Sequence, residues 1–317
     1  PWLNCLRSHR HGADFCRPSL AMIGNSEFKF IAEELRRDIE DHLSRVALLC
    51  RVFARGKDPQ SLADKLAREP GKYSSSSKKI QDAIGIRVAC YFSEDIEIVK
   101  RLLCSKYEFD DASSTIDTPH SDQFTVSRYN LIFRLTDELA RDFSRAVGDR
   151  PIDACFEVQL RSVLSEGWHE VEHDLRYKTK SHWDDAQDLS RALNGIVATL
   201  ETSEWSMKRV FDDLAYRHYK HGGWSAMLHS KLRMRVKPVL SAQVCEILDA
   251  DSELAKQAFR IDRDRVITAL ASARPRIPVT LDNLLYIGNT LQFGNSKLHE
   301  LTPQLVCDAL SGKSATD

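Results

Sequence analysis

The chain lacks any pair of cysteines at metal-ligand spacing. Its 8 cysteines are scattered singly, and no CxxC pair occurs. Zinc sites and small disulfide frameworks usually need such pairs, so buried, reduced thiols are expected instead. An excess of one charge is absent as well, because 45 lysines and arginines face 46 aspartates and glutamates. The overall charge therefore does not favour nucleic acid or an anionic membrane as a partner.

Long apolar runs are also missing. No stretch approaches the ~20 apolar residues needed to cross a bilayer, and the first residues lack the layout of a secretory signal. These absences predict a cytoplasmic protein with no membrane partner. Residues 1–21 mix Arg, His, Cys and Pro without periodicity, so we expect them to form a flexible leader.

The order of the predicted elements indicates an α+β fold. Apolar residues recur at helical spacing from Ser26 to Phe53, which predicts one long amphipathic helix. The following predictions are a short helix at 60–68, a serine-rich loop at 74–77, strands at 86–92, 124–135 and 152–160, and a helix at 93–105.

Two later helices, at 162–177 and 184–216, are expected to cover the sheet together. The glycine pair at 222–223 marks the predicted boundary between a domain at 22–217 and a small helical C-terminal domain at 224–317, whose role is unknown. Helices within that second domain are predicted at 239–259, 262–273 and 281–291.

Two acidic residues stand at positions suited to a metal site. Asp82 comes just before a glycine turn that leads into a buried strand, and Glu157, Gln159 and Arg161 alternate along another strand and so share one face. If the two strands are neighbours, Asp82 and Glu157 could share a hard divalent cation, which prefers oxygen ligands and also binds phosphates. The alternative is a pair of unrelated surface carboxylates.

Basic residues cluster before Asp82, and they could bind phosphates. Ser61 adds a hydroxyl donor to a group formed by Arg55, Lys57, Lys65, Arg68, Lys72, Lys78 and Lys79. Guanidinium and ammonium groups of this kind suit a triphosphate. A solvated helix face would look the same, and no GxxxxGK[ST] phosphate loop is present to decide.

The stretch from Trp168 to Lys178 contains the pattern HExxH, in which two histidines one helical turn apart bind zinc in metalloproteases. Glu172 and Asp174 place charges where a buried zinc helix prefers apolar residues. A zinc protease is therefore a minor alternative.

Four motifs in order resemble the RelA/SpoT synthetase family. They are SLADKLAR from Ser61, DxxGIR from Asp82, EVQLR from Glu157 and WHEVEHDLRYK from Trp168. The resemblance covers about 150 residues and explains the HExxH pattern without zinc. It implies a nucleotidyltransferase-like mixed sheet covered by helices. It also implies an enzyme that transfers the β,γ-pyrophosphate of ATP to the 3′-hydroxyl of GDP or GTP, making (p)ppGpp.

The resemblance also implies roles for individual residues. Asp82 and Glu157 would hold Mg²⁺ and act in catalysis. ATP would be bound by Arg55 and Arg87, which would sandwich adenine, and by three residues on the phosphates: Ser61, Lys65 and Arg68. The acceptor would be bound by Gln159, by Glu166, which stands where relatives often carry Asn or His, and by Tyr129.

The family's acceptor loop, Gly-Tyr-x-Ser-x-His, is altered. Here the chain reads Phe124-Thr-Val-Ser127-Arg-Tyr129, so Ser127 is kept while the Gly-Tyr pair and the His are absent. Phe124 or Tyr129 could replace the stacking ring, although an aromatic residue on a strand is more often part of the core. Glu166 favours guanine, because one carboxylate can accept both donors of that base.

We therefore expect a stand-alone alarmone synthetase, or a toxin-like relative. The residues before Ser26 are too few for the family's hydrolase domain, so synthetase activity alone is expected. The same transfer to an adenine nucleotide or a tRNA 3′ end is the first alternative. A catalytically weak nucleotide-binding module is the second. Self-association into a homo-oligomer is kept open.

Overall fold

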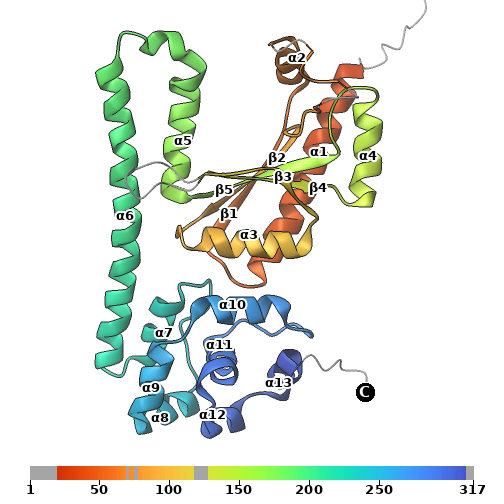
Figure 1. Ribbon diagram of the computed structural model, residues 1–317. Coiled ribbons are helices and arrows are strands. Elements are labelled where there is room, and N and C mark those ends of the chain that lie inside the picture. Colours follow the sequence, from red (N-terminus) through yellow and green to blue (C-terminus); the bar gives the residue numbers. More distant parts are fainter. Residues whose placement is uncertain (1–19, 69–70, 75–77, 118–127, 312–317) are drawn as a thin grey trace, which may run out of the picture.

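The computed structural model describes residues 20–68, 71–74, 78–117 and 128–311 of this 317-residue chain. A five-stranded mixed sheet in the order β1-β2-β5-β4-β3 forms its centre (Figure 1). The strands are β1 (Cys50–Gly56), β2 (Ile84–Cys90), β3 (Phe109–Asp117), β4 (Arg128–Arg134) and β5 (Cys155–Ser162). β2 and β5 run parallel, and the other neighbours are antiparallel.

Three helices cover one face of this sheet: α1 (Leu20–Ser44), α3 (Asp95–Lys106) and α4 (Asp137–Val147). The strands alternate, so that side chains such as Val88, Val158 and Phe156 point into this layer and are fully buried. Phe28 and Phe143 bring α1 and α4 together in the same core, with ring centroids 5.5 Å apart. The mixed sheet and its helices confirm the α+β prediction.

The long helix predicted at 26–53 is wrong after Ser44. α1 ends there, the chain turns through Ala47 with φ 53, and β1 begins at Cys50. Val52 fits both the helical period and the core face of a strand, so the apolar pattern alone did not mark the change. β1 forms because it pairs with β2 along its whole length. β3 was not predicted, since its sequence is polar and much of it is exposed.

The prediction that two helices cover the sheet together is wrong for the second of them. α5 (Val163–Leu175) packs on β5 and β2, whereas the 34-residue α6 (Gln187–Lys220) packs on α5, α7 and α9. Figure 1 shows α5 and α6 as a hairpin standing beside the sheet, joined through the 3₁₀ helix η1 (Tyr177–Trp183). The sheet face toward α5 carries Arg87, Gln159 and Arg161. A second, apolar helix on this face would bury these charged and polar groups without partners, which is unfavourable.

The C-terminal region is helical, as predicted. α6 reaches Lys220, and Gly222 turns the chain at φ 69. The remaining elements are α7 (Trp224–Leu232), α8 (Ala242–Ala250), α9 (Ser252–Phe259), α10 (Arg263–Ser272), α11 (Leu281–Gly288), the π-helix η2 (Asn289–Phe293), α12 (Ser296–Leu301) and α13 (Gln304–Ser311). None of the described helices is long and apolar enough to cross a membrane.

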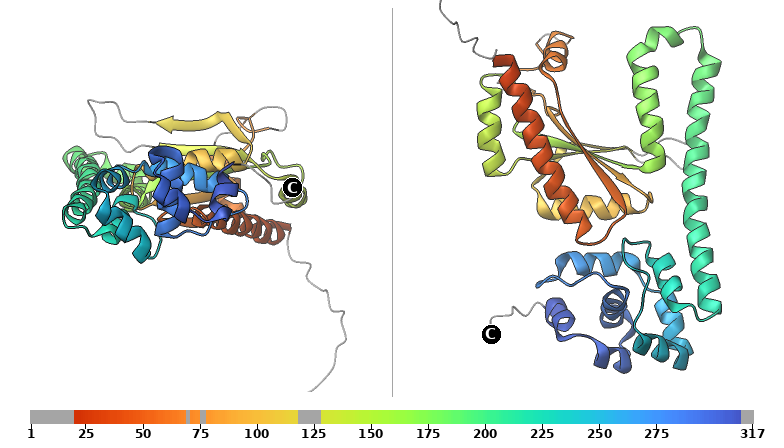
Figure 2. Two further views of the ribbon diagram at one scale, coloured as in Figure 1. Left: turned by 90° about the horizontal axis from the view of Figure 1, so that it is seen from below. Right: turned by 180° about the vertical axis from the view of Figure 1, so that it is seen from behind.

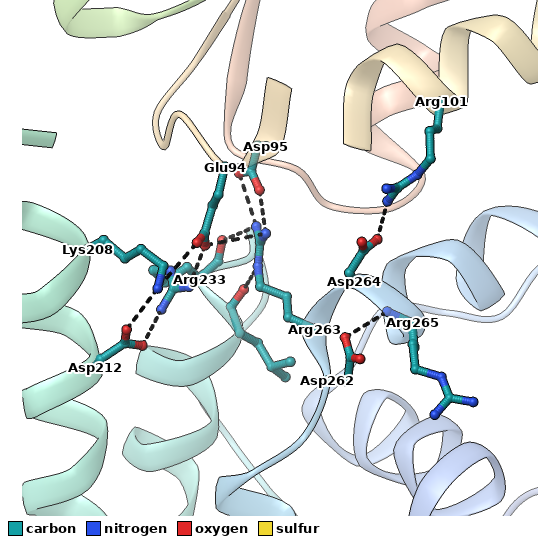
Figure 3. A network of polar contacts seen from close by, with 11 residues as sticks. Glu94, Asp95, Arg101, Lys208, Asp212, Arg233, Asp262, Arg263, Asp264 and Arg265 are labelled. Carbon is teal, nitrogen blue, oxygen red and sulfur yellow. Dashed lines mark hydrogen bonds and ion pairs between the residues drawn. The ribbon is translucent and has the colours of Figure 1, made fainter. Parts of the chain in front are cut away.

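A polar network joins this region to the start of α3 (Figure 3). Arg263 of α10 makes a two-pronged contact with Asp95, and both side chains are buried, at 8% and 1% exposure. Arg233 contacts Glu94 at 2.5 Å and Asp212 of α6 at 3.0 Å. Because Glu94 and Asp95 stand at the N-terminus of α3, their charges also favour its dipole.

Candidate active site

The face of β1, β2 and β5 that lies opposite α1 and α3 carries the polar residues. Residues that face one another across neighbouring strands point to the same side, so the register defines two rows. One row contains Arg55, Gly85 and Glu157, and the next contains Phe53, Arg87 and Gln159. The sequence left open whether the strand after Asp82 and the strand with Glu157 are neighbours, and in the structure β2 and β5 pair directly.

Asp82 lies in the loop before β2 and is held by two lysines. Lys57 Nζ donates to its Oδ2 at 2.7 Å, and Lys65 Nζ donates to both carboxylate oxygens at 2.9 and 2.8 Å. Burial alone would raise the pKa of Asp82, but the hydrogen bonds and charges of the two lysines outweigh it, and the pKa is lowered. Asp82 is therefore a stable anion that is paired with the ammonium groups of Lys57 and Lys65.

Glu157 is the opposite kind of carboxyl group. Burial raises its pKa, and the negative charge of nearby Asp82 raises it further. Gln159 Nε2 donates to Glu157 Oε2 at 3.1 Å and partly offsets this. Two acids with pKa values pushed in opposite directions are typical of sites that divide metal binding and proton transfer between them.

Asp82 and Glu157 could bind a hard cation only together with further oxygen atoms, such as those of a bound nucleotide's phosphates. Mg²⁺ is usually bound through one or two carboxylates plus substrate phosphates, which matches Asp82 and Glu157. Within the described ranges, no group of three or more His, Cys, Asp or Glu side chains could hold a metal ion. A cation at this place would therefore depend on phosphate oxygens for its remaining ligands.

A chain of ion pairs links the sheet face to α5. Arg87 Nη1 lies 2.5 Å from Glu166 Oε1 and 2.5 Å from Glu170 Oε1. Arg161 donates to Glu166 Oε2 at 3.1 Å and to the side-chain oxygen Oε1 of Gln159 at 3.3 Å. Glu166 is thus shared by the guanidinium groups of Arg87 and Arg161.

The other predicted ATP residues lie at the same end of the sheet. Arg55 is exposed on β1, and Lys65 lies on α2 (Pro59–Arg68). Ser61 on α2 donates from its hydroxyl to Asp58 at 2.6 Å and from its amide at 2.9 Å, so it also fixes the start of that helix. Arg68 ends α2, but its side chain lies outside the described residues.

The aromatic residue predicted for the acceptor is not brought to this face. Tyr129 is 7% exposed and points into the core, where its hydroxyl donates to Glu97 at 2.6 Å. The reason is register: Tyr129 faces Leu160 across the strands, whereas Asn130 faces Gln159. Phe124 and Ser127 lie outside the described residues.

Part of this chain matches a known protein family. Residues 54–182 match the family described as the region found in RelA / SpoT proteins. We refer to this matched segment as the RelA/SpoT region. The chain is similar to GTP pyrophosphokinase YjbM of Bacillus subtilis, with 25% identity over 127 residues. That match covers 40% of this chain and 56% of the relative, so it spans little more than half of the curated protein.

Solved structures of related proteins also match. A GTP pyrophosphokinase family protein from Streptococcus pneumoniae is 19% identical, with a TM-score of 0.47, over 59% of this chain and 91% of that one. Small alarmone synthetase 1 from Bacillus subtilis is 20% identical, with a TM-score of 0.43, over 58% of this chain and 92% of that one.

The HExxH pattern of the RelA/SpoT region lies on α5, and its histidines have different surroundings. His169 is buried and packs edge-on against Trp168. His173 is about half exposed, and its Nδ1 lies 2.9 Å from Asp174. The two rings are therefore in different environments, one within the hairpin and one at its surface.

Sequence reasoning gave no specific role to two residues that lie beside Asp82 and Arg87. Lys57 was only one member of the basic cluster, yet it holds Asp82. Phe53 was assigned to a helix, yet it lies beside Arg87 on the open face with 52% of its surface exposed. Strand alternation from Arg51 to Arg55 was the signal available for Phe53.

Proposed function

We propose that the RelA/SpoT region is an ATP-dependent pyrophosphokinase that transfers pyrophosphate to the 3′-hydroxyl of GDP or GTP. The observation that carries this proposal is the juxtaposition of Asp82 and Glu157, two carboxyls with opposite pKa shifts, beside Lys57 and Lys65. Such a cluster suits a reaction that binds polyphosphate and moves one proton.

The lysines are suited to the triphosphate of ATP. In this structure both lysines form ion pairs with Asp82. A bound Mg²⁺, held by Asp82 and Glu157, would take over that role and would neutralise charge on the phosphates during transfer. Lys57 and Lys65 could then turn their ammonium groups to the phosphate oxygens, with Ser61 near the same helix start as a further donor.

The base of ATP fits between two arginines. Arg55 faces Gly85, so Arg87 is its diagonal neighbour on the adjacent strand. Diagonal neighbours are about 7–8 Å apart, roughly twice the ~3.5–4 Å contact distance of stacked groups. A planar base can therefore lie between the two guanidinium planes, provided that Arg87 turns away from Glu166 and Glu170 on α5. Phe53 offers an apolar edge at the same place.

The transfer itself needs alignment and one proton acceptor. The 3′-oxygen of the acceptor attacks the β-phosphorus of ATP, the bond from that phosphorus to the α-phosphate oxygen breaks, and AMP leaves with the electron pair. Glu157 accepts the hydroxyl proton, a role that its raised pKa favours. Positioning and charge neutralisation supply most of the rate, as in other phosphoryl transfers.

The acceptor is proposed as guanine from the position of Glu166. Its carboxylate is linked to Gln159 through Arg161, which donates to both side chains. It could accept from both donors of guanine, whereas the ring nitrogen of adenine is an acceptor and would be repelled. An adenine nucleotide or a tRNA 3′ end is the competing acceptor, since the family's acceptor loop is altered here.

The test is a transfer assay with γ-labelled ATP and a panel of GDP, GTP, ADP and tRNA. Asp82→Asn and Glu157→Gln are each expected to lower transfer by roughly 10³-fold, the scale of several kcal/mol of lost transition-state stabilisation. Asp64→Asn is the matched control, because this acid on α2 is exposed and its side chain accepts a hydrogen bond from Gln60, away from Asp82 and Glu157. Unchanged transfer in both site variants would overturn the proposal.

A further inference from the structure

A cavity of about 410 Å³ lies between α6, the start of α3 and the end of β5. α6 contacts the rest of the chain on either side of it. Before the cavity, Trp168 Nε1 of α5 donates to the carbonyl oxygen of Leu193 at 3.1 Å, and after it, Phe211 packs edge-on against Phe92 with ring centroids 5.6 Å apart. Figure 2 shows α6 along the outer edge of the molecule, beside α5. The volume is within the range of small-molecule sites, about 300–1,000 Å³.

One wall of the cavity is apolar. Ile96 of α3 lines it together with Val197, Leu200 and Trp205 of α6. Ile96 and Val197 are almost fully buried, whereas Trp205 keeps 60% of its surface exposed. The indole of Trp205 can therefore border the opening and pack against an aromatic ring or a cation. The body of a ligand at this wall would be apolar.

The polar end of the cavity is acidic. Glu201 and Glu204 stand three positions apart on α6, so their side chains lie on the same side of that helix, and both line the cavity. Glu201 Oε2 is buried and has no hydrogen-bond partner within the described part of the chain. A buried polar atom without a partner costs free energy. The donor group of a bound ligand would remove that cost.

Glu204 is held by hydroxyl groups. It accepts from Ser162, the N-cap residue of α5, and from Ser93. Burial raises the pKa of Glu204, and the negative charge of Glu201 raises it further, although the two hydroxyls partly offset this. A cation between the two carboxylates would favour the ionised form of both.

The lysine of the cavity is turned toward other carboxylates. Lys208 Nζ lies 3.6 Å from Glu94 and 3.2 Å from Asp212 (Figure 3). Glu94 is also bound by Arg233, at 2.5 Å. The charges of Lys208 and Glu94 are thus balanced within this network, and a cationic ligand is complementary to the remaining pair of acids.

We propose that this cavity binds a small organic cation, with an ammonium or guanidinium group on an apolar body of about the size of one aromatic ring. The cationic group donates to Glu201 and Glu204, and the apolar body lies against Leu200 and Trp205. A bare metal ion suits the cavity less, because it would need further oxygen ligands that the apolar wall does not supply.

The cavity is separate from the cluster of Asp82 and Glu157. Ser162 follows Glu157 by five positions at the end of β5, and a strand rises by about 3.3 Å per residue, so roughly 16 Å separate the two. An odd number of steps also places their side chains on opposite faces of the sheet. A cation in the cavity therefore does not compete with a nucleotide, and the proposal does not depend on the proposed transfer reaction.

Isothermal titration calorimetry of the full chain with phenethylamine tests the proposal. This probe carries an ammonium group at neutral pH, and phenethyl alcohol is the matched control, because it has the same apolar body without the charge. Saturable binding of the amine is expected, with affinity for the alcohol lower by roughly tenfold or more, the scale of one lost charge-assisted hydrogen bond. No saturable binding of the amine, or equal affinity for both compounds, would overturn the proposal.

Three variants locate the binding. Glu201→Gln should weaken amine binding by roughly tenfold or more, and Leu200→Trp should do the same by filling the cavity while both carboxylates remain. Asp213→Asn is the matched control, because Asp213 is an exposed acid of the same helix that does not line the cavity, and it should bind as wild type does. Equal affinity in wild type and in folded Glu201→Gln and Leu200→Trp, or an equal loss in Asp213→Asn, would refute this location.

Discussion

Replacing Arg263 by alanine should destabilise the protein far more than replacing Arg101, although both arginines join α3 to α10 (Figure 3). Arg263 is 8% exposed and contacts Asp95, which is 1% exposed. Arg101 contacts Asp264, and these side chains are 50% and 49% exposed. The two ion pairs therefore differ mainly in burial, which makes them a matched comparison within one interface.

The expected magnitudes follow from that burial. Removing one partner of a buried pair leaves an uncompensated charge and costs about 3–5 kcal/mol. Arg263 also donates to the carbonyl oxygens of Leu232 and Arg233, which would lose a partner as well. An exposed pair contributes only about 0.2–1 kcal/mol, because water and salt screen it. The free energy of unfolding should thus fall by several kcal/mol in Arg263→Ala and by less than about 1 kcal/mol in Arg101→Ala.

The loss should also depend on pH, through Asp95. Burial raises the pKa of Asp95 even with Arg263 present, and removing the guanidinium should raise it further. A carboxyl group whose pKa is higher in the folded state loses stability as pH rises from its unfolded pKa through its folded pKa. The deficit of Arg263→Ala should therefore be largest at neutral pH and smaller at mildly acidic pH, where Asp95 takes up a proton.

Urea unfolding followed by tryptophan fluorescence and far-UV circular dichroism, at one fixed protein concentration, measures these differences. Asp95→Asn in the Arg263→Ala background should recover part of the loss, since it removes the unpaired charge. If Arg263→Ala costs no more than Arg101→Ala, or if its deficit does not shrink on acidification, the reasoning from burial is refuted.

Three further predictions concern the site. Arg87→Lys keeps the charge but loses the planar stacking surface, so ATP binding should weaken by about 1–2 kcal/mol; equal affinities in calorimetry would contradict the adenine sandwich. Glu166→Gln should reduce the preference for GDP or GTP over ADP by about 1–3 kcal/mol in the transfer assay, and a wild type that prefers ADP or tRNA would exclude a guanine acceptor. His169→Ala with His173→Ala should leave zinc content unchanged by elemental analysis, because wild type should hold none; stoichiometric zinc lost in the double variant would restore the protease alternative.

The sequence by itself determined the local parts of the site. Alternation along β5 put Glu157, Gln159 and Arg161 on one face, and the acid before Gly85 marked the entrance to β2, because strand geometry has a fixed period of two. The motifs pointed to the RelA/SpoT region, and apolar periodicity predicted C-terminal helices at 239–259, 262–273 and 281–291. The first of these is divided into α8 and α9 at Asp251, and α7, α12 and α13 were not predicted. These features depend on residues that are neighbours in the chain, so a single sequence carries them.

Only the tertiary structure decided the rest. β1 exists as a strand because β2 lies beside it, although its apolar residues continued the helical spacing of α1. Lys57 donates to Asp82, and Arg263 contacts Asp95, which is 168 positions away in the sequence. Tyr129 points into the core because the register pairs Asn130, and not Tyr129, with Gln159. Each of these outcomes depends on which distant surfaces pack together and on how strands align, and no local pattern contains that information.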